Sequence, residues 1–215
     1  MQPTQDMVRY YAQRATEYER IYALPERQRD LRTLCELVES TFVARRVLDV
    51  ACGTGYFSAW AARRAASLDG IDANEETLQL ARTKNIPHAA FVQGDAYELA
   101  PPAPPYDGTL CTCWWSHMPK ARIADFLHGM HRCLAPGASV LLADNRFVPG
   151  SSTPVARTDA DGNTYQVRSL TDGSKHEVLK NFPAAAELVD WAMRFGTGIE
   201  LRQLTYYWIL RYRAR

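Results

Sequence analysis

One short stretch, from Val47 to Ser58, constrains the fold of this chain more than any other. It has the sequence VLDVACGTGYFS. The apolar, partly β-branched start is typical of a strand that is buried on both faces. Gly53 and Gly55 then end the strand, because glycine admits positive φ and lets a ligand approach the backbone closely. A helical pattern follows from Tyr56 to about Ala66. This succession of strand, glycine turn and helix lets backbone N–H groups converge on a nucleotide-like ligand.

The class of ligand depends on what surrounds the two glycines. A dinucleotide fingerprint has a third glycine at the position where this chain has Ser58. Asp49 adds a carboxylate at the end of the strand, which would repel a pyrophosphate and suit a ligand with a cationic end. The pattern therefore disfavours an NAD-dependent oxidoreductase, which stays as the weakest alternative. A strand and glycine turn also occur without any ligand, so the segment needs support from the rest of the chain.

Carboxylates stand at the ends of three predicted strands. Asp49 lies in the first strand (about 46–51), Asp72 ends the second, and Asp95 follows the third (about 89–93). The carboxyl ends of parallel strands lie along one edge of a sheet, where ligands bind. The two oxygens of Asp72 can accept both O–H groups of a ribose cis-diol. Three acids at this spacing indicate one ligand site more specifically than any one of them.

The segment LDVACGTGYFS resembles the first motif of the class I S-adenosylmethionine (SAM)-dependent methyltransferases. Ala51 stands where the family's acid-x-Gly-x-Gly-x-Gly pattern has its first glycine. The turn GDA and the segment CLAPGASVLLAD are similar to later parts of the same family. The resemblance implies SAM as cofactor and S-adenosylhomocysteine (SAH) as product. It also implies which residues bind SAM: Asp49, Ala51, Cys52, Gly53, Thr54 and Gly55 at its amino-acid end, Asp72 and Ala73 at the ribose, Asp95 and Ala96 at the adenine, and Tyr11 from an N-terminal helix that covers the cleft.

The fold that the resemblance implies is α/β. We expect a seven-stranded, mostly parallel sheet with helices on both faces, strand order 3-2-1-4-5-7-6 and an antiparallel last strand. Thr164–Leu170 and Lys175–Leu179 flank the turn TDGS and predict a β-hairpin inserted after the fifth strand, with a loop before it. A single domain is expected over residues 1–215, divided into a helical N-terminal cover (1–43), a SAM-binding core (44–146), an insertion or lid (147–180), and a C-terminal helix and strand pair (181–215).

The end of the fourth predicted strand carries the candidate residues for the methyl acceptor, because in this family that strand end faces the methyl group. His117 is the candidate catalytic base, since an ordinary histidine pKa of about 6.5 suits proton transfer at neutral pH. A sulfonium is already electrophilic, so a base is optional when donor and acceptor are well aligned. Capping of the following helix is the structural alternative for Ser116 and His117. The candidate substrate-binding residues are Tyr18, Trp114, Trp115, Ser116 and Arg168.

The acceptor itself is not legible in the sequence. With 25 basic and 24 acidic residues the chain lacks the basic excess of a nucleic-acid-binding protein. We therefore expect a small-molecule acceptor with an O, N or S nucleophile, ahead of RNA or protein. A non-catalytic SAM-binding protein stays open. The five cysteines have no metal-ligand spacing and no run is apolar enough to span a membrane. We expect a cytoplasmic protein without a metal, and the sequence is compatible with a homodimer.

Overall fold

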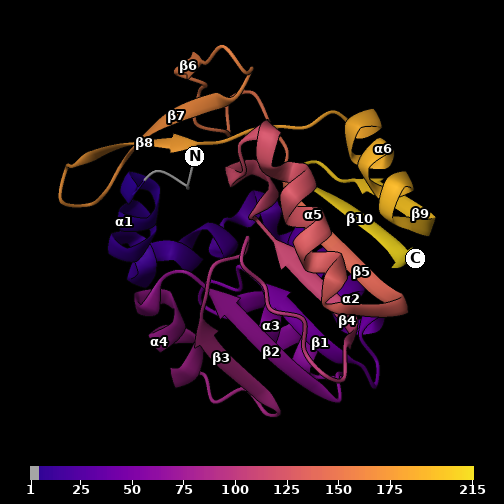
Figure 1. Ribbon diagram of the computed structural model, residues 1–215. Coiled ribbons are helices and arrows are strands. Elements are labelled where there is room, and N and C mark those ends of the chain that lie inside the picture. The colour runs from indigo at the N-terminus through magenta and orange to yellow at the C-terminus, as the bar shows by residue number, and fades with distance from the viewer. Residues whose placement is uncertain (1–4) are drawn as a thin grey trace.

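A computed structural model describes the backbone of residues 5–215 (Figure 1). Residues 1–4 of the expected N-terminal cover lie outside the described part. Within that part the strands form a seven-stranded sheet in the order β3-β2-β1-β4-β5-β10-β9. The strands are β1 (Arg46–Val50), β2 (Ser67–Asp72), β3 (Ala89–Gln93), β4 (Tyr106–Thr112), β5 (Leu134–Asn145), β9 (Gly196–Gln203) and β10 (Tyr207–Ala214).

The strand directions confirm the predicted topology. β1 pairs in parallel with β2 and β4, β2 with β3, and β4 with β5. β10 runs antiparallel to both β5 and β9. With β9 and β10 as the sixth and seventh strands of the sheet, the order is the expected 3-2-1-4-5-7-6. All carboxyl ends of β1, β2, β3 and β4 therefore lie at one edge.

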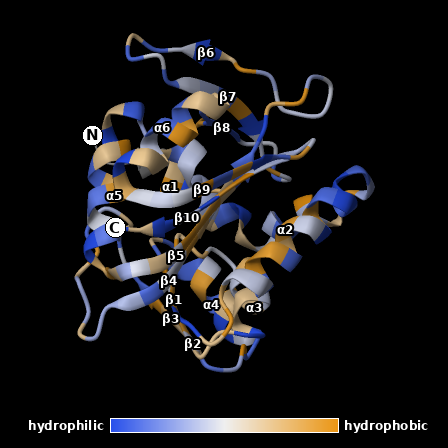
Figure 2. Cartoon of the chain, turned by 90° about the vertical axis from the view of Figure 1, so that its right-hand side faces the viewer, coloured by the Kyte–Doolittle hydropathy of each residue, from blue (hydrophilic) through white to orange (hydrophobic). Residues whose placement is uncertain are grey.

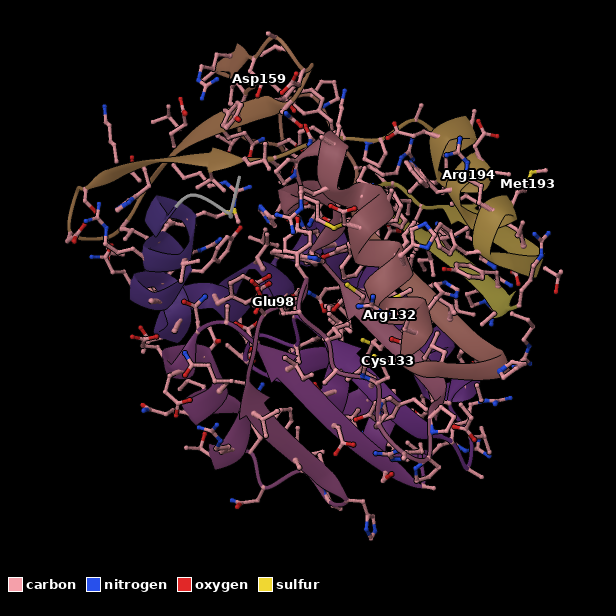
Figure 3. The ribbon with its side chains drawn as sticks, viewed as in Figure 1. Glu98, Arg132, Cys133, Asp159, Met193 and Arg194 are labelled. Carbon is pink, nitrogen blue, oxygen red and sulfur yellow. The ribbon has the colours of Figure 1, made fainter. Side chains whose placement is uncertain are left out.

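Helices cover both faces of this sheet, as the edge-on view in Figure 2 shows. On one side lie α2 (Gln28–Thr41), α3 (Tyr56–Ala62) and α4 (Glu75–Thr83), and on the other α5 (Ile123–Arg132) and α6 (Ala185–Phe195). Side chains alternate between the faces of a strand, so Val47 and Leu48 enter different cores. The outer face of α6 meets solvent, where Met193 is 55% exposed (Figure 3).

A small second sheet follows β5 in the chain. It consists of β6 (Arg157–Thr158), β7 (Thr164–Ser169) and β8 (Lys175–Leu179), all antiparallel. The predicted hairpin is thereby confirmed, whereas β6 was expected to be loop. α1 (Gln5–Arg14) packs on β8 through Met7, Tyr10, Val178 and Leu179 (Figure 1). The N-terminal helix and the insertion thus form one covering layer.

Some element boundaries differ from the sequence prediction. The fifth strand, which the segment CLAPGASVLLAD predicts over about 138–143, spans Leu134–Asn145, because it pairs with β4 on one side and β10 on the other along most of this length. The helix expected to reach about Ala66 ends at Ala62. α1 continues as a 3-10 helical segment, Ala15–Ala23, in which Ala15 and Tyr22 are buried.

Candidate functional site

The glycine turn after β1 forms an open backbone cradle. Ala51, Gly53 and Gly55 all have left-handed φ angles, of 56°, 55° and 74°. A Cβ added to Gly53 would meet no atom within 4 Å, whereas one added to Gly55 would lie 3.1 Å from Ala81 Cβ. Gly53 therefore faces open space where a ligand can approach the backbone, and Gly55 serves the packing of α3 on α4. Ala51 tolerates its left-handed conformation at a cost of about 1–2 kcal/mol.

Asp72 ties this turn to the start of α4. Its Oδ2 accepts a hydrogen bond from Gly53 N at 2.8 Å, and its Oδ1 accepts from Asn74 N at 2.9 Å. Burial raises the pKa of the Asp72 carboxyl, and the bonds from Asn74 and Gly53 oppose that rise. The side chain thus has a structural role in addition to the ligand role that the sequence predicts for it. Asn74 makes no side-chain capping bond.

Asp49 is a buried acid with an unsatisfied oxygen. It is 1% exposed, and its Oδ2 accepts a hydrogen bond from Ser58 Oγ at 2.6 Å. Its Oδ1 has no hydrogen-bond partner. Burial raises the pKa of Asp49 to about 7, against the opposing effect of Ser58. A buried carboxylate oxygen without a partner is costly, and this cost is what favours the protonated form of Asp49.

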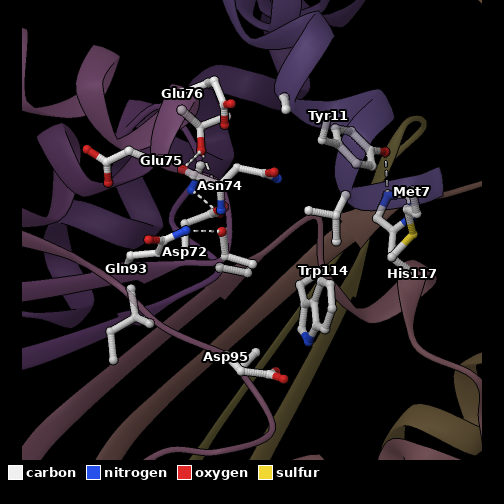
Figure 4. A pocket seen from close by; sticks show the side chains of 18 of the residues that line it. Met7, Tyr11, Asp72, Asn74, Glu75, Glu76, Gln93, Asp95, Trp114 and His117 are labelled. Atoms are coloured by element: carbon white, nitrogen blue, oxygen red, sulfur yellow. Dashed lines mark hydrogen bonds between the residues drawn. The ribbon is translucent and has the colours of Figure 1, made fainter. Parts of the chain in front are cut away.

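A cavity of about 810 Å³, called here the first cavity, opens at the sheet edge below α1 (Figure 4). This volume is ordinary for a small-molecule site. Asp72 and Asp95 from the strand ends lie on one side of it, and Tyr11, Trp114 and His117 on another. Asp95 uses Oδ1 to accept from Tyr97 N at 2.8 Å, so it also shapes its own turn. The predicted SAM-binding residues that line this cavity are Tyr11, Ala51, Gly53, Asp72, Ala73, Asp95 and Ala96.

The other predicted SAM-binding residues do not line the first cavity. Asp49 lies behind the turn, and Cys52 belongs to the core on the α2 side. Thr54 Oγ1 donates to Glu19 Oε1 at 2.6 Å, which joins the turn to the N-terminal segment. Gly55 packs against Ala81. The turn reverses direction within a few residues, so only some of its members can face the same space.

A second cavity of about 500 Å³ lies on the other side of Tyr11 and His117. Tyr11, Tyr18, Cys113 and His117 line both cavities, and Arg168 from β7 lines the second. The two cavities therefore meet at the end of β4, under α1. Sequence reasoning placed Tyr18 and Arg168 among the substrate-binding candidates, and the structure brings both to this region.

His117 has a defined hydrogen-bonding state at this junction. Its Nδ1 lies 2.7 Å from the backbone oxygen of Leu179. A carbonyl only accepts, so Nδ1 carries the proton and Nε2 is left with a lone pair. The Tyr11 hydroxyl donates to Nε2 at 2.8 Å, and Arg168 donates to the Tyr11 oxygen at 3.1 Å. Burial, reinforced by the nearby charge of Lys180, lowers the pKa of His117 well below its ordinary value. His117 is therefore a neutral imidazole at pH 7.

The two tryptophans after β4 have different surroundings. Trp114 lines the first cavity, and its buried Nε1 has no hydrogen-bond partner. Trp115 is 4% exposed and packs edge-on against Trp208 of β10, with ring centroids 5.9 Å apart. The prediction that Trp115 binds substrate is therefore wrong: the 3-10 turn that follows the strand directs it into the core.

Ser116 is also enclosed and does not line either cavity. Its backbone N and its Oγ both donate to Asp144 Oδ2 at 2.8 Å. Lys180 Nζ donates to Ser116 Oγ at 2.5 Å and to Asp144 Oδ1 at 3.1 Å. Burial would raise the pKa of Asp144, but Lys180 and the hydrogen bonds hold it at about 2. The prediction that Ser116 binds substrate is therefore wrong. Ser116 is part of a buried ion-pair network beneath His117.

Sequence reasoning missed Asp144 and Lys180. Asp144 was detectable, since it is a fourth acid near the end of a central strand. Nothing local to Lys180 distinguishes it from a surface lysine. Within residues 5–215 no helix is long and apolar enough to cross a membrane. The described residues also contain no cluster of three or more His, Cys, Asp or Glu side chains arranged to hold a metal ion.

The comparisons with known proteins agree with this geometry. A family model described as a methyltransferase domain matches residues 47–137. Over 168 residues the chain is 30% identical to a ubiquinone biosynthesis O-methyltransferase of Pseudomonas aeruginosa (strain LESB58), covering 75% of this chain and 68% of that relative. It is 31% identical to a fatty-acid O-methyltransferase of Mycolicibacterium smegmatis over 71% of this chain and 60% of that relative.

A solved structure shares the fold along almost the whole chain. The DhpI–SAH complex superposes with a TM-score of 0.79 at 22% identity, covering 98% of this chain and 96% of that one. The matches to the curated relatives span about half to two thirds of those proteins' lengths. The chain belongs to the class I SAM-dependent methyltransferases.

Proposed function

We propose that this protein transfers a methyl group from SAM to an O, N or S nucleophile of a small-molecule acceptor. One observation carries the proposal: the glycine turn after β1 and the acids at the ends of β2 and β3 line a single cavity of about 810 Å³. SAM carries a positive sulfonium and an ammonium group and no phosphate. An acidic cavity with an open backbone cradle suits such a ligand.

The residues present fit SAM at both ends of the first cavity. Ala51 and Gly53 line the cavity, and Gly53 leaves open space there, so the amino-acid end of SAM is assigned to this turn. Asp72 and Ala73 are assigned to the ribose, and Asp95 and Ala96 to the adenine. SAM, when bound, supplies a methyl group on a positively charged sulfur.

His117 is the proposed general base for an acceptor that must lose a proton. His117 lies where both cavities meet, and its Nε2 has a lone pair. The hydrogen bond from Nδ1 to the backbone oxygen of Leu179 holds the ring in this tautomer. With SAM bound, the acceptor atom would form its bond to the methyl carbon as the bond from that carbon to sulfur breaks and SAH leaves, and the proton of the acceptor atom would pass to Nε2. The Tyr11 hydroxyl occupies the one lone pair of Nε2, so an acceptor hydroxyl either displaces Tyr11 or passes its proton to Nε2 through the Tyr11 hydroxyl.

The proposal also includes a cytoplasmic location and no nucleic-acid partner. Cys35, Cys111 and Cys133 are buried free thiols, which suit a reducing compartment. A small acceptor is supported by the second cavity, whose volume of about 500 Å³ lies in the range of small-molecule sites.

Calorimetric titration with SAM, SAH and NAD tests the donor part of this proposal. We expect one saturable site for SAM and for SAH and no saturation with NAD. Saturable NAD binding without SAM binding would contradict the proposal and revive the oxidoreductase alternative. The transfer step itself is tested by the labelling experiment that closes the Discussion.

A further inference from the structure

The two cavities have opposite charge. Among the described residues the first is lined by four carboxylates (Asp72, Glu75, Glu76 and Asp95) and one arginine, Arg9. The lining of the second contains, within the same described range, six cations and the single acid Glu17; the cations are Arg14, Arg20, Arg27, Arg146, Arg168 and Lys180. A concave surface with an excess of one sign concentrates ligands of the opposite sign. The second cavity is therefore built for a negative ligand.

Most of these cations have no counter-charge from the protein. Arg20 pairs with Glu17 at 3.6 Å, and Lys180 pairs with Asp144 at 3.1 Å. In the part of the chain that the structure describes, the other four arginines have no carboxylate within ion-pair distance. Arg14 lies over the rings of Tyr10 and Tyr18 instead.

Arg27 is the most constrained of the four. It is 8% exposed, its guanidinium lies 5.2 Å from the Tyr206 ring centroid, and one nitrogen donates to Asn145 Oδ1 at 3.3 Å. Its Nε is buried and has no hydrogen-bond partner. A buried charge without a partner is expensive, so a guanidinium with an unsatisfied donor in a cavity wall points to an anion that it binds.

Arg168 links the positively charged second cavity to the proposed base, His117, through hydrogen bonds. It donates to Gln166 Oε1 at 2.7 Å and to the Tyr11 oxygen at 3.1 Å, both neutral acceptors. Tyr11 in turn donates to His117 Nε2. A ligand held by Arg168 therefore lies one side chain away from the proposed base. Guanidinium groups bind phosphate and carboxylate oxygens in pairs, with two parallel N–H···O bonds.

We propose that the second cavity binds an anionic group of the methyl acceptor, a phosphate, phosphonate or carboxylate, with Arg168 and Arg27 as its main ligands. This inference rests on the proposed function, because it names the substrate class of the same site. Donor and acceptor would then enter cavities of opposite charge that meet at Tyr11 and His117. The charge separation orients the two substrates before any contact with the reacting atoms is made.

Calorimetry on the SAH-loaded protein tests the proposal with three probes that share a phenyl ring: phenylphosphonate, benzoate and benzyl alcohol. We expect saturable binding of at least one anion, weakened by salt, and no binding of the alcohol. Preference for phenylphosphonate or for benzoate distinguishes a phosphorus acid from a carboxylate. Arg168→Gln should lower the affinity for the anion about tenfold or more, which is the loss expected for one charge-assisted hydrogen bond.

The matched control is Arg32→Gln, which removes the same charge from an exposed position on α2 outside both cavities. This variant should bind the anion with an affinity within about twofold of the wild type, because exposed charges are screened by salt. Arg146→Gln, at a half-buried cavity position, gives a second variant if Arg168→Gln does not fold. Equal binding of the alcohol and the anions, or equal effects of the cavity and control variants, would overturn the inference and leave SAM binding intact. Failure of the wild type to bind SAH would overturn the proposed function, and this inference with it.

Discussion

Replacing Asp49 by asparagine should change how stability depends on pH. Burial raises the folded-state pKa of Asp49 from 3.8 to about 7. Between these values the folded protein binds a proton that the unfolded chain has released, so stability falls as pH rises through this range. This rise in pKa corresponds to roughly 4 kcal/mol of free energy of unfolding in total. Roughly 2–3 kcal/mol of it is lost between pH 5 and pH 8. The asparagine of Asp49→Asn does not ionise, so the variant does not lose this stability as pH rises.

The assay is urea unfolding of the wild type and Asp49→Asn at several pH values from 5 to 8. Subtracting the two free energies of unfolding cancels the other titrating groups, and the difference should shift by roughly 2–3 kcal/mol in favour of the variant as pH rises. Asp190→Asn, at an exposed position on α6, is the control and should give a flat difference. Parallel stability curves for wild type and Asp49→Asn would refute the reasoning that Asp49 is a buried, unpaired acid.

Four further substitutions separate binding, chemistry and packing. Asp72→Ala should weaken SAM binding by roughly 1–3 kcal/mol in calorimetry, because ligand groups lose their acceptor; an unchanged affinity would remove Asp72 from the site. His117→Ala should lower the rate by about 10²–10⁴-fold on an O–H acceptor and leave SAM affinity nearly unchanged. Since the pKa of His117 lies well below its ordinary value, the wild-type rate should stay level from pH 6.5 to pH 9 and fall only in more acidic solution; a midpoint at or above pH 6.5 would contradict a neutral buried base. Trp115→Ala should lower the free energy of unfolding by about 3–5 kcal/mol and leave SAM affinity unchanged. Trp114→Ala should instead weaken SAM binding. The reverse pattern would restore Trp115 to the site.

The sheet and the donor side of the site were predictable because their signals are local. A buried strand, a glycine turn and an acid at a strand end each occupy a few consecutive residues. Their assembly at one edge follows from parallel pairing, and the structure places Asp72 and Asp95 there together. The strand order came from the resemblance, since periodicity alone does not say which strands are neighbours.

The orientation of consecutive side chains after a strand was not predictable. Trp114 and Trp115 are adjacent and chemically identical, yet one lines a cavity and the other meets Trp208. The choice depends on the 3-10 turn over Trp115–His117 and on a strand near the other end of the chain. The same holds for Ser116, whose hydroxyl is taken by Asp144 and Lys180.

The charge of the second cavity was also invisible in the sequence. Its cations come from the end of α1 and the 3-10 segments after it, from the loop after β5, and from the inserted sheet and the residue that follows it, which are far apart in the chain. The overall charge of +1 gave no sign of it, because the acids of the first cavity are offset by these arginines. Only the packing of α1 on β8 brings Arg168 close to Tyr11.

The most direct test of the proposed activity is methyl transfer from methyl-labelled SAM in a cell extract that is afterwards divided into small-molecule, nucleic-acid and protein fractions. We expect protein-dependent label in the small-molecule fraction, in an anionic compound that mass spectrometry identifies, and a much weaker signal with Asp72→Ala. Label in RNA or protein would overturn the substrate class while keeping the methyltransferase activity. Bound SAM with no transfer to any fraction would contradict the account and favour a SAM-binding protein without catalysis.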